Sequence, residues 1–295
     1  MHAIDHQLTT DTTYFDFQKA FDSVPHERLK IKLHQCGIRD PILNWISSFL
    51  SERQQRVVVN DVLSQWEKVT SGVPQGSVLG PILFIIFIND IHEGINSCIK
   101  LYADDTKLFR VIKDDNDPKT LQDDIYRLSS WADKWQLKFH PEKCRILHVG
   151  EGNSNYYRLT NTDCDFLPRT QIQKDLGVYI DDKLNFNEHV SRAVTKANQT
   201  LGLIRRSFQY LDKETLCLLF KSIVRPLLEY GNTIWHPILK RDIDKIESVQ
   251  RRATKLVPCL KNLPYAERLK KLDLPSLSYR RNRGDMIVAY KKICN

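Results

Sequence analysis

The chain lacks the features that mark membrane-spanning, secreted and zinc-binding proteins. Its longest apolar run, residues 78–88, is far shorter than the roughly 20 residues that a membrane-spanning helix needs. Residues 1–13 show no basic start followed by an apolar core, so no secretory signal is visible. None of the seven cysteines forms a Cys-x-x-Cys pair. We therefore expect an intracellular protein with reduced thiols, in the cytoplasm or the nucleus, and no membrane partner.

Composition and charge indicate a folded protein with an uneven charge distribution. The 295 residues are 41% hydrophobic and 27% charged, which is typical of a globular chain with one large domain or two smaller ones. Residues 1–182 hold 21 basic and 26 acidic side chains, whereas residues 183–295 hold 23 and 10. A basic segment beside an acidic one favours binding of a polyanion by the second segment. The alternative is a Lys/Arg-rich helical surface without such a partner.

Two adjacent carboxylates, Asp104 and Asp105, form the most informative local pattern. They lie between apolar runs that read as two short strands, so we expect them at the tip of a hairpin. Like charges side by side repel, and a divalent cation such as Mg²⁺, which prefers carboxylate oxygens, is the simplest compensation. The alternative is a solvated turn, since the chain has other Asp-Asp pairs, at 114–115, 123–124 and 181–182.

A third carboxylate, Asp16, lies in an aromatic, strand-like run, where an unpartnered charge would be costly. Further along, residues 71–77 form a loop of small residues before an apolar helix. After residue 182 the sequence pattern becomes helical, and it predicts four helices, at residues 187–208, 212–229, 241–256 and 276–290.

Three segments follow one another along the chain: Phe-Asp-Phe-Gln-Lys-Ala-Phe-Asp at 15–22, Ser-Gly-Val-Pro-Gln-Gly-Ser-Val-Leu-Gly-Pro at 71–81 and Tyr-Ala-Asp-Asp at 102–105. This ordered set resembles the palm domain of reverse transcriptases, in the branch of the non-LTR (LINE-type, jockey-like) retrotransposons. Residues 224–230 and 249–254 resemble the region that follows the palm in such elements.

The resemblance implies an α+β fold, in which an antiparallel sheet with packed helices forms a polymerase palm at 1–182. A basic, helical, thumb-like region at 183–295 follows it. It also implies an RNA-directed DNA polymerase that binds an RNA template, a DNA primer and deoxynucleoside triphosphates. The basic helical region would grip the template–primer duplex through its phosphates, independently of sequence.

Nucleotide addition is an in-line displacement at phosphorus that two metal ions about 3.5–4 Å apart assist. By resemblance, Asp16, Asp104 and Asp105 are the catalytic carboxylates that hold two Mg²⁺ ions, for which Mn²⁺ is a possible substitute.

The resemblance assigns three more residues to nucleotide and template binding. Phe21 matches an aromatic that blocks a ribose 2′-hydroxyl and so selects deoxynucleotides; the alternative is an ordinary core phenylalanine. Gln75 and Gly76 match the loop that contacts template and incoming nucleotide. Glycine allows close backbone approach, and an amide bonds bases or sugars without charge. The alternative there is a plain loop before a helix.

Residues 137–144 resemble the next palm motif, with His140 where asparagine is common. Its Lys143 is the candidate general acid that protonates pyrophosphate, and the alternative is a solvated lysine. Residues 174–178 resemble the primer grip, in which the backbone at Leu176 and Gly177 positions the primer end.

The family's fingers region, with its triphosphate-binding cations, should precede Asp16. Only fifteen residues do, and none is Lys or Arg. We therefore expect a truncated member without fingers and endonuclease regions, and with weakened triphosphate binding. This leaves an alternative function: a catalytically inactive remnant that only binds nucleic acid. An RNA-copying RNA polymerase is disfavoured by Phe21, and a metal-dependent nuclease does not explain Gln75 and Gly76.

Overall fold

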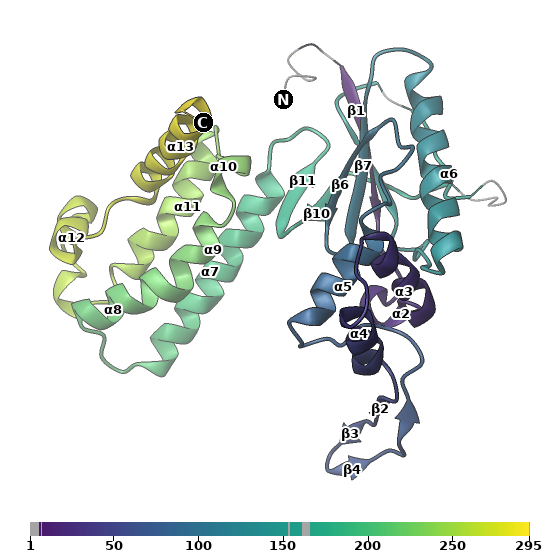
Figure 1. Cartoon of the computed structure of the whole chain (residues 1–295). Helices are drawn as coiled ribbons and strands as arrows, with labels where there is room; N and C mark the ends of the chain where they lie inside the picture. The colour runs from purple at the N-terminus through teal and green to yellow at the C-terminus, as the bar shows by residue number, and fades with distance from the viewer. Residues whose placement is uncertain (1–5, 7, 153, 161–165, 295) are drawn as a thin grey trace. The chain divides into compact units, whose positions relative to one another are not determined.

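The computed structural model describes residues 6, 8–152, 154–160 and 166–294. The chain divides into two compact units, Met1–Gln171 and Ile172–Asn295 (Figure 1). The division precedes the sequence-based boundary at 182, because the hairpin that starts at Ile172 has its contacts in the second unit. The division into two compact units does not define where a polymerase palm ends, so the palm at residues 1–182 and the thumb-like region at 183–295 remain predictions.

A five-stranded sheet organises the first unit, in the order β6-β7-β1-β8-β9. Strand β1 lies at its centre and pairs antiparallel with β7 and β8, while the short β9 joins β8 in parallel. The strands are β1 (Thr9–Phe15), β6 (Cys98–Tyr102), β7 (Asp105–Ile112), β8 (Arg145–Val149) and β9 (Arg169–Thr170). With the helices below, this confirms the α+β class, and the predicted antiparallel sheet gains one parallel edge strand.

Helices pack against this sheet. The long α6 buries the apolar stripe that its periodicity predicts, with Leu121, Ile125 and Leu128 fully buried. Helix α5 is apolar on all sides but buries only part of its surface: Leu83, Phe84 and Phe87 are buried, whereas Ile82 and Ile85 are exposed. The helices of the unit are α2 (Ala20–Ser23), α3 (His26–Gln35), α4 (Ile42–Leu50), α5 (Leu79–Ile88) and α6 (Asp117–Trp135).

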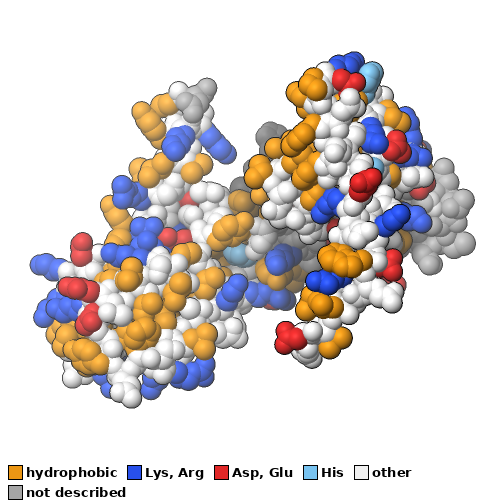
Figure 2. Space-filling model, turned by 60° about the horizontal axis from the view of Figure 1, so that its bottom comes forward, with side chains coloured by type: hydrophobic (Ala, Val, Ile, Leu, Met, Phe, Trp, Pro, Cys, Tyr) orange, Lys and Arg blue, Asp and Glu red, His pale blue; other side chains and the backbone are white. Residues whose placement is uncertain are grey.

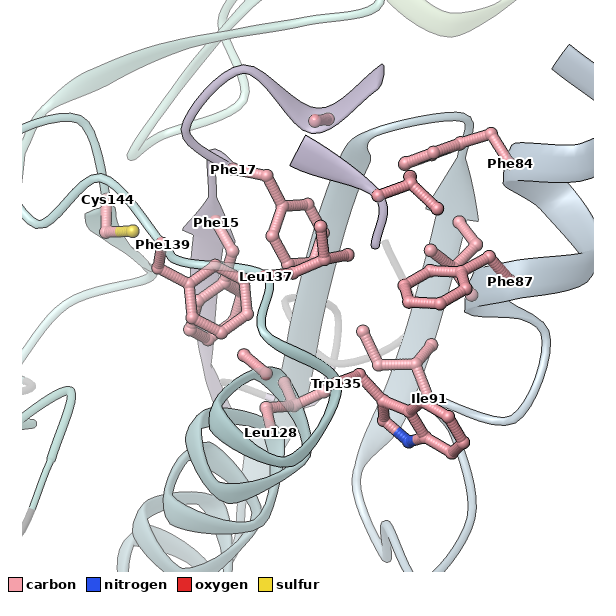
Figure 3. Packing of buried hydrophobic residues seen from close by; sticks show 14 of the residues in the cluster. Phe15, Phe17, Phe84, Phe87, Ile91, Leu128, Trp135, Leu137, Phe139 and Cys144 are labelled. Atoms are coloured by element: carbon pink, nitrogen blue, oxygen red, sulfur yellow. The ribbon is translucent and has the colours of Figure 1, made fainter. Parts of the chain in front are cut away.

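Aromatic side chains of the core fix the end of β1 (Figure 3). Phe139 lies against both Phe15 and Phe17, with ring centroids 5.2 and 4.5 Å apart. Phe15 and Phe17 are both buried, and side chains alternate between faces along extended backbone. The residue between them, Asp16, is therefore directed away from this core.

A two-stranded projection, residues 53–69, extends from the first unit and is called the arm below (Figure 1). It contains β2 (Gln54–Gln55) paired with β5 (Glu67–Lys68), and β3 (Val58–Val59) paired with β4 (Val62–Leu63). Both central residues of its turn, Asn60 and Asp61, have positive φ, as a type I′ hairpin requires. The sequence predicts this hairpin, because residues 54–59 and 62–69 read as two strands around Asn60-Asp61, and the structure contains it. Figure 2 shows hydrophobic and basic side chains exposed along the arm.

The second unit joins a hairpin to a helical bundle whose core includes Phe220, Trp235 and Ile246. The predicted helix at 212–229 is interrupted by a π-helical segment, Phe220–Val224, that precedes Pro226. Among the described residues, no helix combines the length and apolarity needed to cross a membrane. The elements are β10 (Ile172–Asp175), β11 (Val178–Asp181), α7 (Asn187–Ser207), α8 (Lys213–Leu219), α9 (Arg225–Glu229), α10 (Asn232–Trp235), α11 (Lys240–Ala253), α12 (Tyr265–Leu272) and α13 (Leu277–Cys294).

Candidate active site

Strand pairing brings two of the predicted carboxylates to one edge of the sheet. In the register of β1 with β7, Phe15 pairs with Thr106. Continuing that antiparallel register by one residue sets Asp16 across from Asp105. Residues 16 and 105, far apart in sequence, thus leave neighbouring strands at the same end.

Asp104 lies in the turn that joins β6 to β7. Tyr102 pairs with Asp105, which leaves Ala103 and Asp104 as a two-residue loop. Ala103 has a positive φ of 53°, a backbone conformation that glycine usually takes at the first position of a type II′ turn. The two carboxylates are exposed at the hairpin tip, as the sequence predicts.

Asp16 finds its partner in Lys143. The lysine Nζ lies 3.4 Å from Oδ1 of Asp16, and both side chains are about half exposed. The backbone holds this pair, because the His140 amide donates to the Asp16 carbonyl at 2.8 Å and the Lys143 amide donates to the His140 carbonyl at 2.9 Å. The charge that sequence reasoning expected to need a partner therefore has one from the motif at 137–144.

Cys144 closes this turn and is fully buried. Burial, together with the nearby Asp16 carboxylate, raises the pKa of its thiol to about 11, although a hydrogen bond with the backbone at Asp16 opposes the rise. The thiol is thus neutral at physiological pH and fills space, because reactive cysteines need a lowered pKa.

The loop at 71–77 is tied to residues 21–24. Nε2 of Gln75 donates to Oδ1 of Asp22 at 2.9 Å, and the Ser71 hydroxyl donates to the Asp22 carbonyl at 2.8 Å. The Val73 amide donates to the Phe21 carbonyl at 2.7 Å. Asp22 therefore orients Gln75. The sequence motif at 15–22 contains Asp22 but predicts no role for it, because its position six residues after Asp16 gives no sign of contact with Gln75.

Phe21, the predicted sugar-selecting residue, stacks on Phe84 of α5 with ring centroids 4.5 Å apart. It is partly buried, so one face supports the core while part of the ring stays accessible. Gly80 at the start of α5 brings that helix close to the loop: a Cβ there would lie 2.2 Å from the Pro74 carbonyl oxygen.

A protein-family model described as "Reverse transcriptase (RNA-dependent DNA polymerase)" matches residues 2–186 of the chain. The chain belongs to the reverse transcriptase family.

Two relatives of the chain are polymerases of mobile elements. The chain is 26% identical over 268 residues to the probable RNA-directed DNA polymerase from transposon X-element of Drosophila melanogaster, covering 86% of this chain and 29% of that protein. It is 27% identical over 271 residues to the RNA-directed DNA polymerase from mobile element jockey of the same species, covering 87% and 29%. The predicted jockey-like, LINE-type membership is confirmed. The chain spans under a third of the length of these relatives.

Among solved structures, apo telomerase from Candida tropicalis is similar over 88% of this chain and 43% of its own, with 12% identity and a TM-score of 0.47. The α+β assignment rests on the strands and helices described above rather than on this match.

Members of this family generally depend on divalent metal ions. Asp16, Asp104 and Asp105 offer the hard oxygen ligands that Mg²⁺ prefers, at one edge of the sheet, so the donor set fits. Within the described ranges, no three His, Cys, Asp or Glu side chains are already gathered as a metal-binding group. The three aspartates therefore lie at the same end of neighbouring strands, but their carboxylates do not form a metal-binding group as they stand.

The predicted primer-grip residues lie in the second unit, in the turn between β10 and β11. Leu176 and Gly177 both have positive φ, which is the type I′ hairpin pattern. The Tyr230 hydroxyl donates to the Leu176 carbonyl at 2.9 Å, and a Cβ on Gly177 would lie 3.0 Å from the Tyr230 ring. Tyr230 thus fixes the backbone of this turn.

Proposed function

We propose that this chain carries the nucleotidyl-transfer site of an RNA-directed DNA polymerase from a non-LTR retrotransposon. The observation that carries the proposal is the pairing of Phe15 with Thr106, which brings the next residue, Asp16, to the end of the sheet where Asp104 and Asp105 form the hairpin tip, in a chain of the reverse transcriptase family. Its substrates are an RNA template, a DNA primer and deoxynucleoside triphosphates.

Asp16, Asp104 and Asp105 would hold the metal. Two Mg²⁺ ions, or Mn²⁺ in their place, supply charge stabilisation for the attacking 3′-oxygen and the leaving pyrophosphate. The exposed hairpin tip leaves both aspartates accessible to solvent and substrate. The Lys143 ammonium, held beside Asp16, is placed to give a proton to the departing pyrophosphate. Phe21 limits the room for a 2′-hydroxyl, and Gln75, oriented by Asp22, meets the nucleotide and template with Gly76.

The second unit contributes a basic groove of about 710 Å³ between α7 and α11. Its lining includes Arg205, Arg252, Lys255 and Lys261, and the described lining residues include no Asp or Glu. Cations without acidic neighbours suit the phosphates of a template–primer duplex, and such contacts weaken steeply with salt. This groove supports the expectation that the basic half grips a polyanion, and the Leu176–Gly177 turn would position the primer end.

Primer extension on an RNA template with Mg²⁺ tests the proposal. We expect extension by the wild-type chain and a loss of about a hundredfold or more in Asp104→Asn, since removing a metal ligand costs several kcal/mol of transition-state stabilisation. Asp115→Asn is the matched control, because Asp115 is an exposed member of another Asp pair in the same unit. Equal extension by Asp104→Asn and Asp115→Asn contradicts the proposal.

The basic groove of the second unit supports one alternative, a catalytically inactive protein that only binds nucleic acid. This alternative predicts binding of an RNA–DNA duplex that depends on salt and on Arg252 and Lys255, together with no extension by any variant in Mg²⁺ or Mn²⁺. Extension that depends on Asp104 excludes it.

A further inference from the structure

Tyr230 stands where the motif at 224–230 ends and helix α9 stops. Its ψ of 121° is not helical, and Gly231, whose φ is 65°, leads into α10. The Trp235 indole donates to the Tyr230 carbonyl at 2.7 Å, and Trp235 is buried in the core of the second unit. The core thus fixes the Tyr230 backbone, whereas the Tyr230 side chain is 59% exposed.

This exposed side chain lies against the turn between β10 and β11. Its hydroxyl donates to the Leu176 carbonyl at 2.9 Å, and its ring leaves no room for a side chain at Gly177, where a Cβ would lie 3.0 Å from Cε1 of the ring. Gly231 makes a further contact with the hairpin, because a Cβ there would lie 3.2 Å from Cγ2 of Val178. Residues 230–231 therefore hold the turn at three points.

The turn that Tyr230 holds is strained and exposed. Leu176 has a φ of 44°, which an L-amino acid adopts only at a cost, and its side chain is 44% exposed. A large apolar side chain in such a place adds little to the core. Strained backbone persists where its surroundings determine it, and such positions cluster at ligand-binding sites. The contact with Tyr230 therefore serves the shape of the turn more than the stability of the unit.

The Tyr230 hydroxyl also changes what the turn offers to a ligand. A bare carbonyl oxygen is an acceptor, and it repels the phosphate oxygens of a nucleic acid, which are acceptors too. The hydroxyl engages the Leu176 carbonyl and so lowers this repulsion. Phenylalanine at position 230 would keep the ring against Gly177 and remove this donor. The hydroxyl can therefore be tested separately from the ring.

We infer that Tyr230 is a positioning residue for the primer end. It keeps the Leu176–Gly177 turn in one conformation, with the Leu176 carbonyl engaged, so that the turn receives the last nucleotide of the primer in one place. Tyr230 acts through the turn and touches no reacting atom. The inference rests on the proposed function, which assigns the primer end to this turn. The motif at 224–230 thereby gains a role that the carboxylates and their metal do not give it.

Two probes on one RNA–DNA duplex test the inference in the full chain, without nucleotide. Fluorescein at the far end of the duplex measures affinity, and 2-aminopurine as the last primer base reports how that base stacks. We expect Tyr230→Phe to keep the wild-type affinity within about twofold, because the phosphate contacts that dominate affinity remain. The change in 2-aminopurine emission on binding should fall by about half or more, as expected when one net hydrogen bond that holds the turn is lost.

The matched control is Tyr279→Phe, which removes a hydroxyl from an exposed tyrosine of α13 in the same unit. With Mg²⁺ and saturating duplex, single-turnover extension by Tyr230→Phe should slow by about 2–10-fold, the range that one net hydrogen bond covers. Tyr279→Phe should keep the wild-type emission change and rate. Urea midpoints should stay at the wild-type value in both variants, which separates positioning from folding.

The outcomes distinguish this inference from the polymerase proposal. Equal primer-end emission in Tyr230→Phe and Tyr279→Phe overturns the role of Tyr230, even when both variants extend primers. A smaller emission change in Tyr230→Phe alone, with its urea midpoint unchanged, supports that role, even when no variant extends a primer. Loss of duplex affinity in step with a lower urea midpoint assigns Tyr230 to folding and overturns the inference. So does a wild-type chain that leaves the emission of the primer end unchanged.

Discussion

The Lys143 Nζ lies 3.4 Å from Oδ1 of Asp16, a residue 127 positions earlier in the sequence. The pair is half exposed, and exposed ion pairs contribute only about 0–1 kcal/mol, so it is not what holds the fold together. Its consequence is positional: the backbone bonds through His140 keep a proton donor beside one of the proposed metal ligands.

Replacing Lys143 should therefore affect chemistry and leave stability unchanged. We expect Lys143→Met to slow single-turnover primer extension by about 10²–10⁴-fold, the usual contribution of a general acid. Lys143→Arg should recover little, because a guanidinium stays protonated and cannot release its proton. The urea midpoint should stay at the wild-type value in both. Lys119→Met is the control, and equal rates for Lys119→Met and Lys143→Met would remove the general-acid role.

Phe21 should set sugar selection. We expect Phe21→Val to raise the ratio of kcat/KM for ribonucleotides over deoxynucleotides by about 10–100-fold, since filling or emptying a small volume in a pocket is worth about 1–3 kcal/mol. Phe21→Tyr keeps the ring that stacks on Phe84 and should keep the wild-type ratio. Competing incorporation of the two nucleotide types measures it. An unchanged ratio in Phe21→Val would make Phe21 an ordinary core side chain.

Local patterns in the sequence predict the local elements well. The turn residues Asn60 and Asp61 and the paired acids at 104–105 both mark hairpins that the structure contains. Their signal is short-range, because two or four residues determine the backbone of such turns. The α6 stripe is predicted for the same reason, since periodicity shows directly which face is buried.

Contacts between distant segments leave no such signal. The Asp22–Gln75 hydrogen bond spans 53 residues, and no local pattern announces it. Helix α12 is missed because its composition is strongly charged, yet Arg268 is buried there and donates to the Leu263 carbonyl and to the Thr254 hydroxyl. A buried arginine whose guanidinium is hydrogen-bonded takes the place of an apolar residue, which a hydrophobic pattern cannot reveal.

The periodicity of residues 26–36 fails in a similar way. The sequence predicts a helix between Pro25 and Gly37 with Leu29, Leu33 and Cys36 on one face. Leu29 and Leu33 are buried, but Cys36 is exposed and Lys32 is buried instead. The Lys32 ammonium pairs with Asp90 and lies 3.7 Å from the centroid of the Trp135 ring. Burial lowers the pKa of Lys32, and the partners that accept its charge are remote in sequence.

The two glycines at 80 and 202 should respond to alanine in opposite directions. A Cβ at Gly80 would lie 2.2 Å from the Pro74 carbonyl, so Gly80→Ala must push the Gln75 loop away from α5. We expect it to lower the free energy of unfolding by about 1–3 kcal/mol, as overpacking does. Gly202 lies within α7 with nothing within 4 Å of its Cβ position, so Gly202→Ala should raise it by about 0.5–1 kcal/mol. Urea unfolding followed by circular dichroism measures both, and a neutral Gly80→Ala would show that the close approach is not required.

His189 should make the second unit sensitive to acid. It is buried on α7, its Nδ1 accepts a hydrogen bond from the Tyr179 amide at 3.3 Å, and its ring lies 4.7 Å from that of Trp235. Burial lowers the pKa of the imidazole. Below about pH 6.5 the unfolded chain takes up a proton that the folded unit resists, so the free energy of unfolding falls as the pH decreases.

The slope of that fall should approach about 1.4 kcal/mol per pH unit for this one proton, and it should vanish in His189→Asn, whose side-chain oxygen can still accept from the Tyr179 amide. Urea midpoints at pH 7.5 and pH 5.5 measure the difference. His34→Asn, at an exposed position on α3, is the matched control and should keep the wild-type pH dependence. Suppose that His189→Asn loses as much stability between the two pH values as His34→Asn does. Removing the titratable imidazole at 189 would then leave the pH dependence of the free energy of unfolding unchanged, and the acid sensitivity would arise from other groups.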